Sequence, residues 1–264
     1  MKIVKEIIRS KENKIIKELK KLKYKKYRDS ENKFLAEGIK FLDYLEHIPE
    51  LIIARENLSE DSIFTTKIQN YTNERTKIIY VDEKVFYDLS SQENSQGVLI
   101  LYKKREFNLE KLSDNIVVLD DVSDPGNLGT IIRICHASNF SDIILTKGSV
   151  DSYNEKVVRA SMGSILNVNL IYLEREKILE LLKEKKYKIF VTYLDERAVS
   201  YNKIEISSKN AIILGNEGRG VADDFLNVAD IKTIIPILGN AESLNVAIAT
   251  ALILYKIREL QNLI

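Results

Sequence analysis

Six short apolar runs in the C-terminal half of the chain constrain the fold more than any other feature. Each is nearly continuous in Val, Ile and Leu, and helical segments separate them. Strands of this kind are buried on both faces, as in a parallel sheet that helices cover. The sequence therefore predicts an α/β fold with a six-stranded parallel sheet, its strands at residues 116–119, 143–146, 168–173, 188–194, 211–215 and 231–237.

Two further helices are predicted in this half. Residues 174–186 place Ile178, Leu181 and Leu182 on one side, with charges elsewhere. Residues 246–257 are apolar on nearly every face, so this helix needs burial on several sides. Ser243 and Asn245 precede it, where a side-chain oxygen can cap free backbone N–H groups. By itself this pattern is that of a capped core helix at the end of an α/β domain.

The N-terminal part predicts a small, separate α/β domain over residues 1–105. Its β-rich runs alternate with helical segments, and they lie at residues 51–55, 78–81 and 97–102. We expect an amphipathic helix over residues 3–22 and a second helix over residues 34–45. Residues 106–114 are charged and lack a core pattern, so they predict a linker to a second domain at 115–264.

The first 33 residues are strongly basic, although the whole chain is nearly neutral. They hold 13 Lys or Arg against 5 Asp or Glu, whereas the 264-residue chain has a net charge of +1. A basic arm of this kind attracts nucleic acid. A solvated, lysine-rich helix face has the same composition, so both interpretations stand at this point.

Several classes of protein are disfavoured by composition. One cysteine, Cys135, and two histidines, His47 and His136, provide no disulfide framework and no Cys or His metal cluster within one chain. The N-terminus lacks the apolar core of a signal peptide. The uncharged run at residues 243–255 is too short to span a membrane. We expect a cytoplasmic protein without a metal site and without a membrane partner.

The first candidate site follows a predicted strand and begins a helix, at residues 119–140. Turn residues at 124–126 precede Asn127, which is in position to act as the N-cap. Arg133 projects from a face other than the apolar stripe, where it can bind a ligand or be simply solvated. Cys135 lies on the apolar stripe and is interpreted as structural.

The second candidate site is the sequence ILGNEGRGV at residues 213–221. Its glycines let backbone groups approach a ligand closely. The spacing is neither a dinucleotide fingerprint nor a P-loop, which disfavours NAD and ATP chemistry. Glu217 can cap a helix, bind a ligand or accept a proton. A tight turn with a capping acid explains the same residues without any ligand.

Both candidate sites and the segment before the last helix begin where predicted strands end, after residues 119, 215 and 237. Ligands of open α/β sheets bind at the carboxyl ends of the strands. The sequence therefore predicts one pocket built from three strand ends.

Three stretches together resemble the ordered motifs of the SpoU/TrmH-type RNA ribose methyltransferases of the SPOUT superfamily. They are DPGNLGTIIR (124–133), LGNEGRGV (214–221) and IPILGNAESLNVAIATALILY (235–255). The match spans the C-terminal half, from about Asn115 to Leu260. The N-terminal part, with FLAEG and SQGVLILY, is similar over a shorter match to the ribosomal-protein-like substrate-binding domain often fused ahead of this catalytic domain.

The resemblance implies transfer of a methyl group from S-adenosylmethionine to a ribose 2′-hydroxyl of structured RNA. The extra N-terminal domain favours ribosomal RNA over tRNA as the substrate. The resemblance also implies a C-terminal trefoil knot and a homodimer whose interface includes the last helix, which would explain its all-round apolarity. A non-catalytic RNA-binding protein of the same fold is an alternative. The presence of all the matched motif side chains argues against it.

The resemblance also implies roles for particular residues. As catalytic residues it carries over Arg133, Asn127, Glu217, Ser243 and Asn245. At the cofactor it places Gly215, Ile235, Leu244 and Asn245, with Tyr193 and Leu194 in a neighbouring loop.

Arg133 is the residue on which we expect activity to depend most. The family is often described with this arginine as the general base, but a guanidinium group has a pKa above about 12. We therefore expect Arg133 to bind the target phosphate or ribose oxygen. Glu217 would then orient Arg133 or accept the proton.

Overall fold

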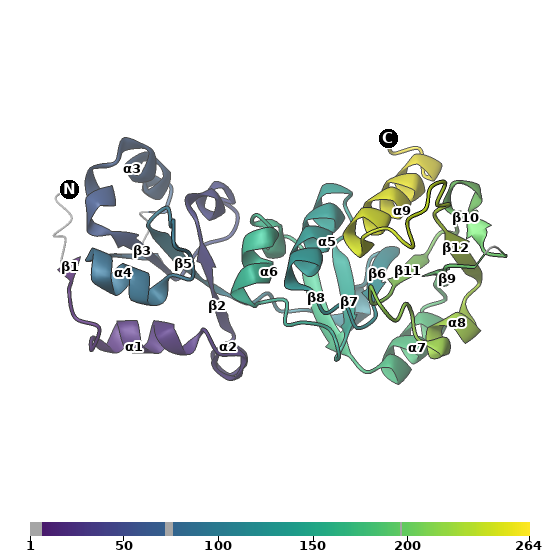
Figure 1. The fold of residues 1–264 in the computed structure, drawn as a ribbon. Coiled ribbons are helices and arrows are strands. Elements are labelled where there is room, and N and C mark those ends of the chain that lie inside the picture. Colours follow the sequence, from purple (N-terminus) through teal and green to yellow (C-terminus); the bar gives the residue numbers. More distant parts are fainter. Residues whose placement is uncertain (1–6, 72–75, 196) are drawn as a thin grey trace. The chain divides into compact units, whose positions relative to one another are not determined.

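The computed structural model describes residues 7–71, 76–195 and 197–264 (Figure 1). The chain divides into two compact units, which are described separately below. Unit 1 comprises residues 1–105 and 153–166, and unit 2 comprises residues 106–152 and 167–264. The segment 153–166, which lies inside the second predicted domain, therefore groups with the first unit. The predicted linker contains a short 3-10 helix, η3 (Leu109–Lys111).

Unit 2 is built on a parallel sheet with the strand order β10-β12-β9-β11-β6-β7-β8. All six predicted strands are confirmed. They are β6 (Asn115–Leu119), β7 (Asp142–Thr146), β8 (Asn169–Leu173), β9 (Lys188–Thr192), β11 (Asn210–Leu214) and β12 (Ile231–Ile234). The additional strand β10 (Val199–Ser200) lies at the edge beside β12. It is too short to leave an apolar run in the sequence.

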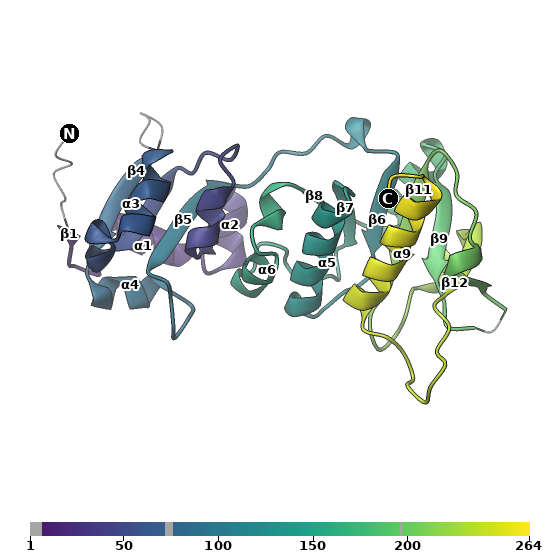
Figure 2. The same cartoon turned by 90° about the horizontal axis from the view of Figure 1, so that it is seen from above.

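Helices cover both faces of the unit 2 sheet (Figures 1 and 2). On one face, α7 (Arg175–Glu184) and α8 (Asp223–Val228) bury Ile178, Leu182 and Phe225 against the strands. On the other face, α5 (Pro125–Ala137) and α9 (Val246–Leu260) lie side by side. Successive strand residues point to opposite faces, so covering both faces requires the near-continuous apolar runs seen in the sequence.

A buried cation fixes α9 along α5. Arg258 is only 8% exposed, and its Nε donates to the carbonyl oxygen of Ser138 at 2.7 Å. Its guanidinium also donates to the carbonyl oxygen of Asn139 and lies 4.2 Å from the ring centroid of Phe140. Burial lowers the pKa of Arg258. These interactions tie the C-terminal part of α9 to the turn that ends α5.

Unit 1 contains a mixed five-stranded sheet in the order β1-β4-β3-β5-β2. Its strands are β1 (Ile7–Ile8), β2 (Lys33–Glu37), β3 (Leu51–Arg55), β4 (Lys77–Val81) and β5 (Val98–Lys103). On one face, α1 (Lys14–Lys21) and α4 (Glu83–Leu89) share a buried core with the strands. The opposite face carries α3 (Ser62–Gln69) and the 3-10 helix η1 (Ile39–Asp43) (Figure 1). The expected small α/β domain is confirmed.

The remaining short elements complete unit 1. Helix α2 (Lys25–Glu31) follows α1 and leads into β2, and the 3-10 helix η2 (Glu56–Glu60) follows β3. Helix α6 (Glu155–Ala160) belongs to the segment 153–166 and contacts β2. The 3-10 helix η4 (Ser164–Leu166) ends this segment. In unit 2, the 3-10 helix η5 (Tyr201–Lys203) follows β10.

The helix predicted over residues 3–22 is wrong in its first half. Residues 7–8 form β1, which pairs with β4, and the helix begins only at Lys14. Asn13 caps it, because its side-chain oxygen accepts from the backbone N–H of Ile15 at 2.9 Å. Residues 3–6 of the predicted helix lie outside the described residues.

The helix predicted over residues 34–45 is also wrong. Residues 33–37 form β2, antiparallel to β5, with Phe34 and Ala36 buried and their neighbours half-buried. This alternation is the period of a strand. Gly38, with φ of 125°, then turns the chain into η1. The apolar residues of the strand and of the short helix together give the sequence pattern of a single helix.

Among the described residues, no helix is long and apolar enough to cross a membrane.

Candidate active site

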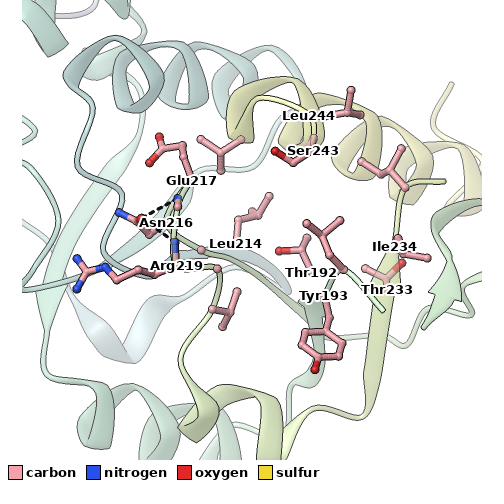
Figure 3. Close-up of a pocket in the computed structure, with 18 of the residues that line it drawn as sticks. Thr192, Tyr193, Leu214, Asn216, Glu217, Arg219, Thr233, Ile234, Ser243 and Leu244 are labelled. Atoms are coloured by element: carbon pink, nitrogen blue, oxygen red, sulfur yellow. Dashed lines mark hydrogen bonds between the residues drawn. The ribbon is translucent and has the colours of Figure 1, made fainter. Parts of the chain in front are cut away.

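Unit 2 contains a cavity of about 540 Å³ at the carboxyl ends of β9, β11 and β12 (Figure 3). Its walls are the loop after β9, the glycine loop at residues 215–221, the segment after β12 and the start of α9. Figure 3 shows Glu217 and Ser243 on one side of the cavity and Tyr193 on the other. The predicted pocket at the strand ends therefore exists, but β9 takes the place that the sequence assigned to β6.

The predicted cofactor residues fall into two groups. Those that line the cavity are Gly215, Ile235, Leu244, Tyr193 and Leu194. Asn245 is not among the lining residues. It is the N-cap of α9, where its side-chain oxygen accepts from the backbone N–H of Ala247 at 2.9 Å. Strand β9 ends at Thr192 and not at residue 194, so Tyr193 and Leu194 belong to the loop.

Gly215 allows the glycine loop to fold back on itself. The backbones of Asn216 and Gly220 exchange two hydrogen bonds, of 3.0 and 2.9 Å, which brings Gly220 against Gly215. A Cβ atom on Gly215 would lie 2.3 Å from the carbonyl group of Gly220, closer than any real contact. Gly215 is therefore required by packing, and the cavity wall at this point is bare backbone.

Asn216, which sequence reasoning did not single out, fixes the shape of this loop. Its side-chain oxygen accepts from the backbone N–H groups of Gly218 and Arg219, at 2.9 and 3.1 Å (Figure 3). Its Nδ2 donates to the carbonyl oxygen of Asp121 in the loop after β6, at 2.9 Å. An Asn at the start of a glycine-rich turn is the available sequence signal, since Asn side chains often bond backbone two residues on.

Asn127 is not the N-cap of α5, as the sequence suggested. Asp124 holds that position and accepts from the backbone N–H of Asn127 at 2.7 Å, with Pro125 as the first helical residue. The Asn127 side chain is therefore released for other contacts. Its Nδ2 donates to Oε1 of Glu217 at 2.6 Å, and its Oδ1 accepts from Nδ2 of Asn245 at 2.8 Å.

Four of the five predicted catalytic residues thus lie close together beside the cavity. Glu217, Asn127 and Asn245 form a hydrogen-bonded chain, and Ser243 lines the cavity two residues before Asn245. Because a carboxylate only accepts hydrogen bonds, Glu217 also fixes the orientation of the Asn127 amide. The chain connects the three motifs that sequence analysis found separately.

Arg133 lies apart from this chain. It is exposed on α5, it is not among the cavity residues, and its side chain forms no hydrogen bond or ion pair with the described residues. It follows Asn127 by six residues, a rotation of about 240° around the helix axis. Its guanidinium is therefore available to a ligand outside the single chain.

A buried carboxylate beside the site was also missed from the sequence. Asp120, at the end of β6, is 1% exposed. It accepts from Nε of Arg175 and from the backbone N–H of Ala222, each at 2.8 Å. These bonds join the loop after β6 to the chain segments that begin α7 and α8. A buried Asp of this kind is expected only with such partners.

Cys135 is buried on α5, and burial raises the pKa of its thiol. A protonated thiol is a poor nucleophile, in agreement with the structural role predicted for it. Among the residues that the structure describes, no group of three His, Cys, Asp or Glu side chains is arranged to hold a metal ion.

Comparison with known proteins matches a family model to a part of each unit. Residues 114–255 match the SpoU rRNA Methylase family, and residues 13–100 match the MRM3-like substrate binding domain. The chain is 32% identical over 253 residues to the 23S rRNA (guanosine(2553)-2′-O)-methyltransferase RlmP of Bacillus subtilis, covering 95% of this chain and 98% of the relative.

Solved structures of methyltransferases resemble this chain over nearly its whole length. The AdoMet-bound rRNA methyltransferase from Sinorhizobium meliloti superimposes with a TM-score of 0.82 at 29% identity, covering 96% of this chain and 97% of that one. The SpoU methyltransferase AviRb from Streptomyces viridochromogenes shares the fold, with a TM-score of 0.82 at 21% identity over 95% and 98% of the two chains.

The fold and the strand-end site define the class of protein, a methyltransferase with a parallel α/β sheet. The chain belongs to the SpoU rRNA Methylase family. The family and the enzyme class expected from the three sequence motifs are thereby confirmed.

We predict that Gly215→Ala destabilises the protein and Gly218→Ala does not. The added methyl group would overlap Gly220 in the first variant, whereas in the second its nearest neighbour is Oδ1 of Asn216 at 3.6 Å. Overpacking should lower the free energy of unfolding by about 2 kcal/mol or more for Gly215→Ala. Gly218→Ala should stay within about 0.5 kcal/mol of the unmodified protein. Urea unfolding measures both, and equal stability of the two variants would contradict the role given to Gly215.

Proposed function

We propose that the protein transfers a methyl group from S-adenosylmethionine to a ribose 2′-hydroxyl of ribosomal RNA. The observation that carries this proposal is the hydrogen-bonded chain of Glu217, Asn127 and Asn245 beside the strand-end cavity, which Glu217 lines. It joins side chains from three family motifs at the place where ligands of parallel α/β sheets bind.

The extent of the similarity supports ribosomal RNA over tRNA. The B. subtilis relative, named as a 23S rRNA methyltransferase, matches over 95% of this chain. A tRNA (guanosine(18)-2′-O)-methyltransferase from Aquifex aeolicus, 29% identical, matches over 59%. The additional unit 1 is therefore a feature shared with the ribosomal RNA enzyme. Methylation of tRNA by the same chemistry is the second candidate.

The cavity fits the proposed cofactor. Gly215 leaves bare backbone for a flat ring to lie against, and Leu214, Ile235 and Leu244 give apolar walls. Three acidic residues, Glu217, Asp223 and Glu242, line the cavity against one basic residue, Arg219, and this excess of negative charge favours a positively charged ligand. Tyr193 and Leu194 would cover the ligand from the loop after β9. Asn245 would act through Asn127 and not by cofactor contact.

S-adenosylmethionine supplies an already activated methyl group, so the protein itself must align the ribose oxygen and receive its proton. Glu217 has one carboxylate oxygen bonded to Asn127. We assign its other oxygen to accepting the proton of the 2′-hydroxyl. Ser243, exposed at the cavity wall, can hydrogen-bond the same ribose.

A guanidinium group keeps its proton at neutral pH, so Arg133 is assigned to binding and not to proton removal. Its exposed position without an ion-pair partner among the described residues suits a contact with an RNA phosphate or ribose oxygen. Because Arg133 lies outside the cavity of its own chain, it would stabilise the charge that develops on the ribose oxygen at the site of the other copy in the homodimer proposed below.

We propose the trefoil knot, the homodimer and a cytoplasmic location as further properties of this protein. After β12, at one side of the sheet, the chain returns across the strand ends to place α9 against α5 and η5. This path supports the knot of the family. A cytoplasmic location agrees with an RNA substrate.

The homodimer proposal rests on the outer face of α9. Ile248, Leu252 and Tyr255 are 54%, 37% and 43% exposed, and their i, i+4 and i+7 spacing puts them on one face. The opposite face is buried in unit 2. An exposed apolar stripe of this kind marks an interaction surface.

We predict that isothermal calorimetry detects binding of S-adenosylmethionine and no binding of NAD. The reason is that the glycine loop follows β11 and lacks the dinucleotide spacing.

A map of ribose methylation in cells with and without the gene then identifies the RNA substrate. Loss of one methyl group in ribosomal RNA is the expected result. Loss in tRNA would support the second candidate, and binding of NAD alone would contradict the proposed enzyme class.

We predict that Arg133→Ala and Arg133→Lys lower turnover on the RNA substrate by about 100-fold or more, as for loss of a transition-state contact. Their affinity for S-adenosylmethionine should not change, because Arg133 is outside the cavity. Asn127→Ala should cost less, since an orienting role is partly replaceable. Lys177→Ala, on the exposed face of α7, is the control. Unchanged turnover in folded Arg133 variants would refute the assignment.

We predict that the protein is a dimer in light scattering at micromolar concentration and that Leu252→Glu shifts it toward monomer, because a charge would be buried at the interface. Ile63→Glu, at a 65% exposed position of α3 in unit 1, is the matched control and should remain dimeric. A monomeric unmodified protein would contradict the proposal.

A further inference from the structure

Unit 1 holds a second cavity, of about 460 Å³, between its first helices and its sheet. Leu51 of β3 and Leu101 of β5, which are partners in the strand register, lie at the sheet side. Ile15, Leu19 and Leu22 line it from the α1 segment. The floor is therefore apolar, and the size is within the range of about 300–1,000 Å³ that small ligands and their recognition groups occupy.

The rim of this cavity is charged and includes an aromatic ring. Tyr27, which is 37% exposed, lines the cavity, and Nζ of Lys21 lies 5.8 Å from its ring centroid. Glu18, Glu31 and Lys77 also line it, and the structure shows no hydrogen bond or ion pair from their side chains to the described residues. These groups are available to a ligand.

The surrounding surface is the most basic stretch of the chain. Residues 20–28, KKLKYKKYR, contain five lysines, one arginine and two tyrosines, without an acidic residue. Tyr24 is 68% exposed, and Lys21, Lys23, Lys25 and Lys26 are exposed as well. Lys20 and Lys25 are engaged by Asp88 and Asp29. Lys26 has no ion-pair partner among the described residues.

This combination matches the chemistry of an unpaired nucleotide. Single-stranded RNA is held by aromatic rings that stack on bases and by lysines that contact phosphates. A carboxylate accepts hydrogen bonds from base N–H groups. Bases in a regular duplex are stacked and paired, so they cannot enter a cavity of this kind.

We propose that the unit 1 cavity binds an unpaired nucleobase of the RNA substrate. Tyr27 lies against the base, Glu18 and Glu31 accept from its N–H groups, and Lys21 and Lys26 bind the adjoining phosphates. This inference rests on the proposed function, because it assumes that the substrate is RNA. In this proposal unit 1 recognises a single-stranded element of the RNA, and the base that it binds is not the nucleotide that is methylated.

The test uses the full-length protein and a short, mixed-sequence, fluorescently labelled RNA, offered as a single strand and as a perfect duplex. Fluorescence anisotropy should give tighter binding of the single strand. Tyr27→Ala and Lys21→Ala should each weaken that binding, about tenfold for the lost stacking of the tyrosine. Duplex binding should change little in Tyr27→Ala.

Two matched controls lie elsewhere in unit 1. Tyr87→Ala removes a tyrosine of α4 that is 41% exposed, and Lys40→Ala removes an exposed lysine of η1, on the other face of the sheet. Both should bind the single strand like the unmodified protein. Equal losses in the controls and in the cavity variants would overturn the proposal, as would unchanged affinity in Tyr27→Ala and Lys21→Ala.

Further measurements separate this inference from the proposed function. Methylation of total cellular RNA with labelled S-adenosylmethionine tests the function alone. If methylation occurs but Tyr27→Ala leaves KM unchanged, the cavity inference fails and the function stands. If Tyr27→Ala instead changes the mass in light scattering and not RNA affinity, the surface binds protein and the inference is wrong. A raised KM with unchanged affinity for S-adenosylmethionine supports it.

Discussion

The arrangement of the candidate active site depends on the side chain of Asn127. Its amide donates to Glu217 and accepts from Asn245, residues that lie 90 and 118 positions away in the chain. A single side chain therefore holds the start of α5, the glycine loop and the start of α9 together. Asn127 can do this because Asp124 caps α5 in its place. Networks of this kind are cooperative, so loss of the central member affects both of its partners.

The cavity beside this network is shaped largely by backbone. Gly215 accepts the close approach of Gly220, and Asn216 holds the loop to the end of β6. Asp120 then joins the loop after β6 to the starts of α7 and α8. A wall fixed in this way needs little rearrangement before a ligand binds, which lowers the free-energy cost of binding.

In the proposed function the two units have different tasks. Unit 2 supplies the cavity for the cofactor and Glu217 as the proton acceptor, whereas unit 1 supplies the basic residues 20–28 and their tyrosines. Phosphate contacts supply affinity for any RNA, and contacts to bases supply selectivity. If unit 1 binds an unpaired base, the selectivity of the protein for its RNA substrate depends on a nucleotide other than the one that is methylated.

By itself the sequence determined the class of fold in unit 2, because strands covered on both faces need continuous apolar runs and leave an unambiguous pattern. It also identified the glycine loop and the residues of the three motifs. In unit 1 the pattern predicted β3, β4 and β5 correctly but failed at residues 34–45. Residues 33–37 and the turn at Gly38 have the apolar spacing of a helix when their partner strand β5 is not considered. Only the tertiary structure decided which residue caps α5, what Asn127 and Asn216 bond, and that the end of β6 does not line the cavity. Each of these depends on contacts between residues in different segments of the chain, and the local spacing of residue types does not indicate such contacts.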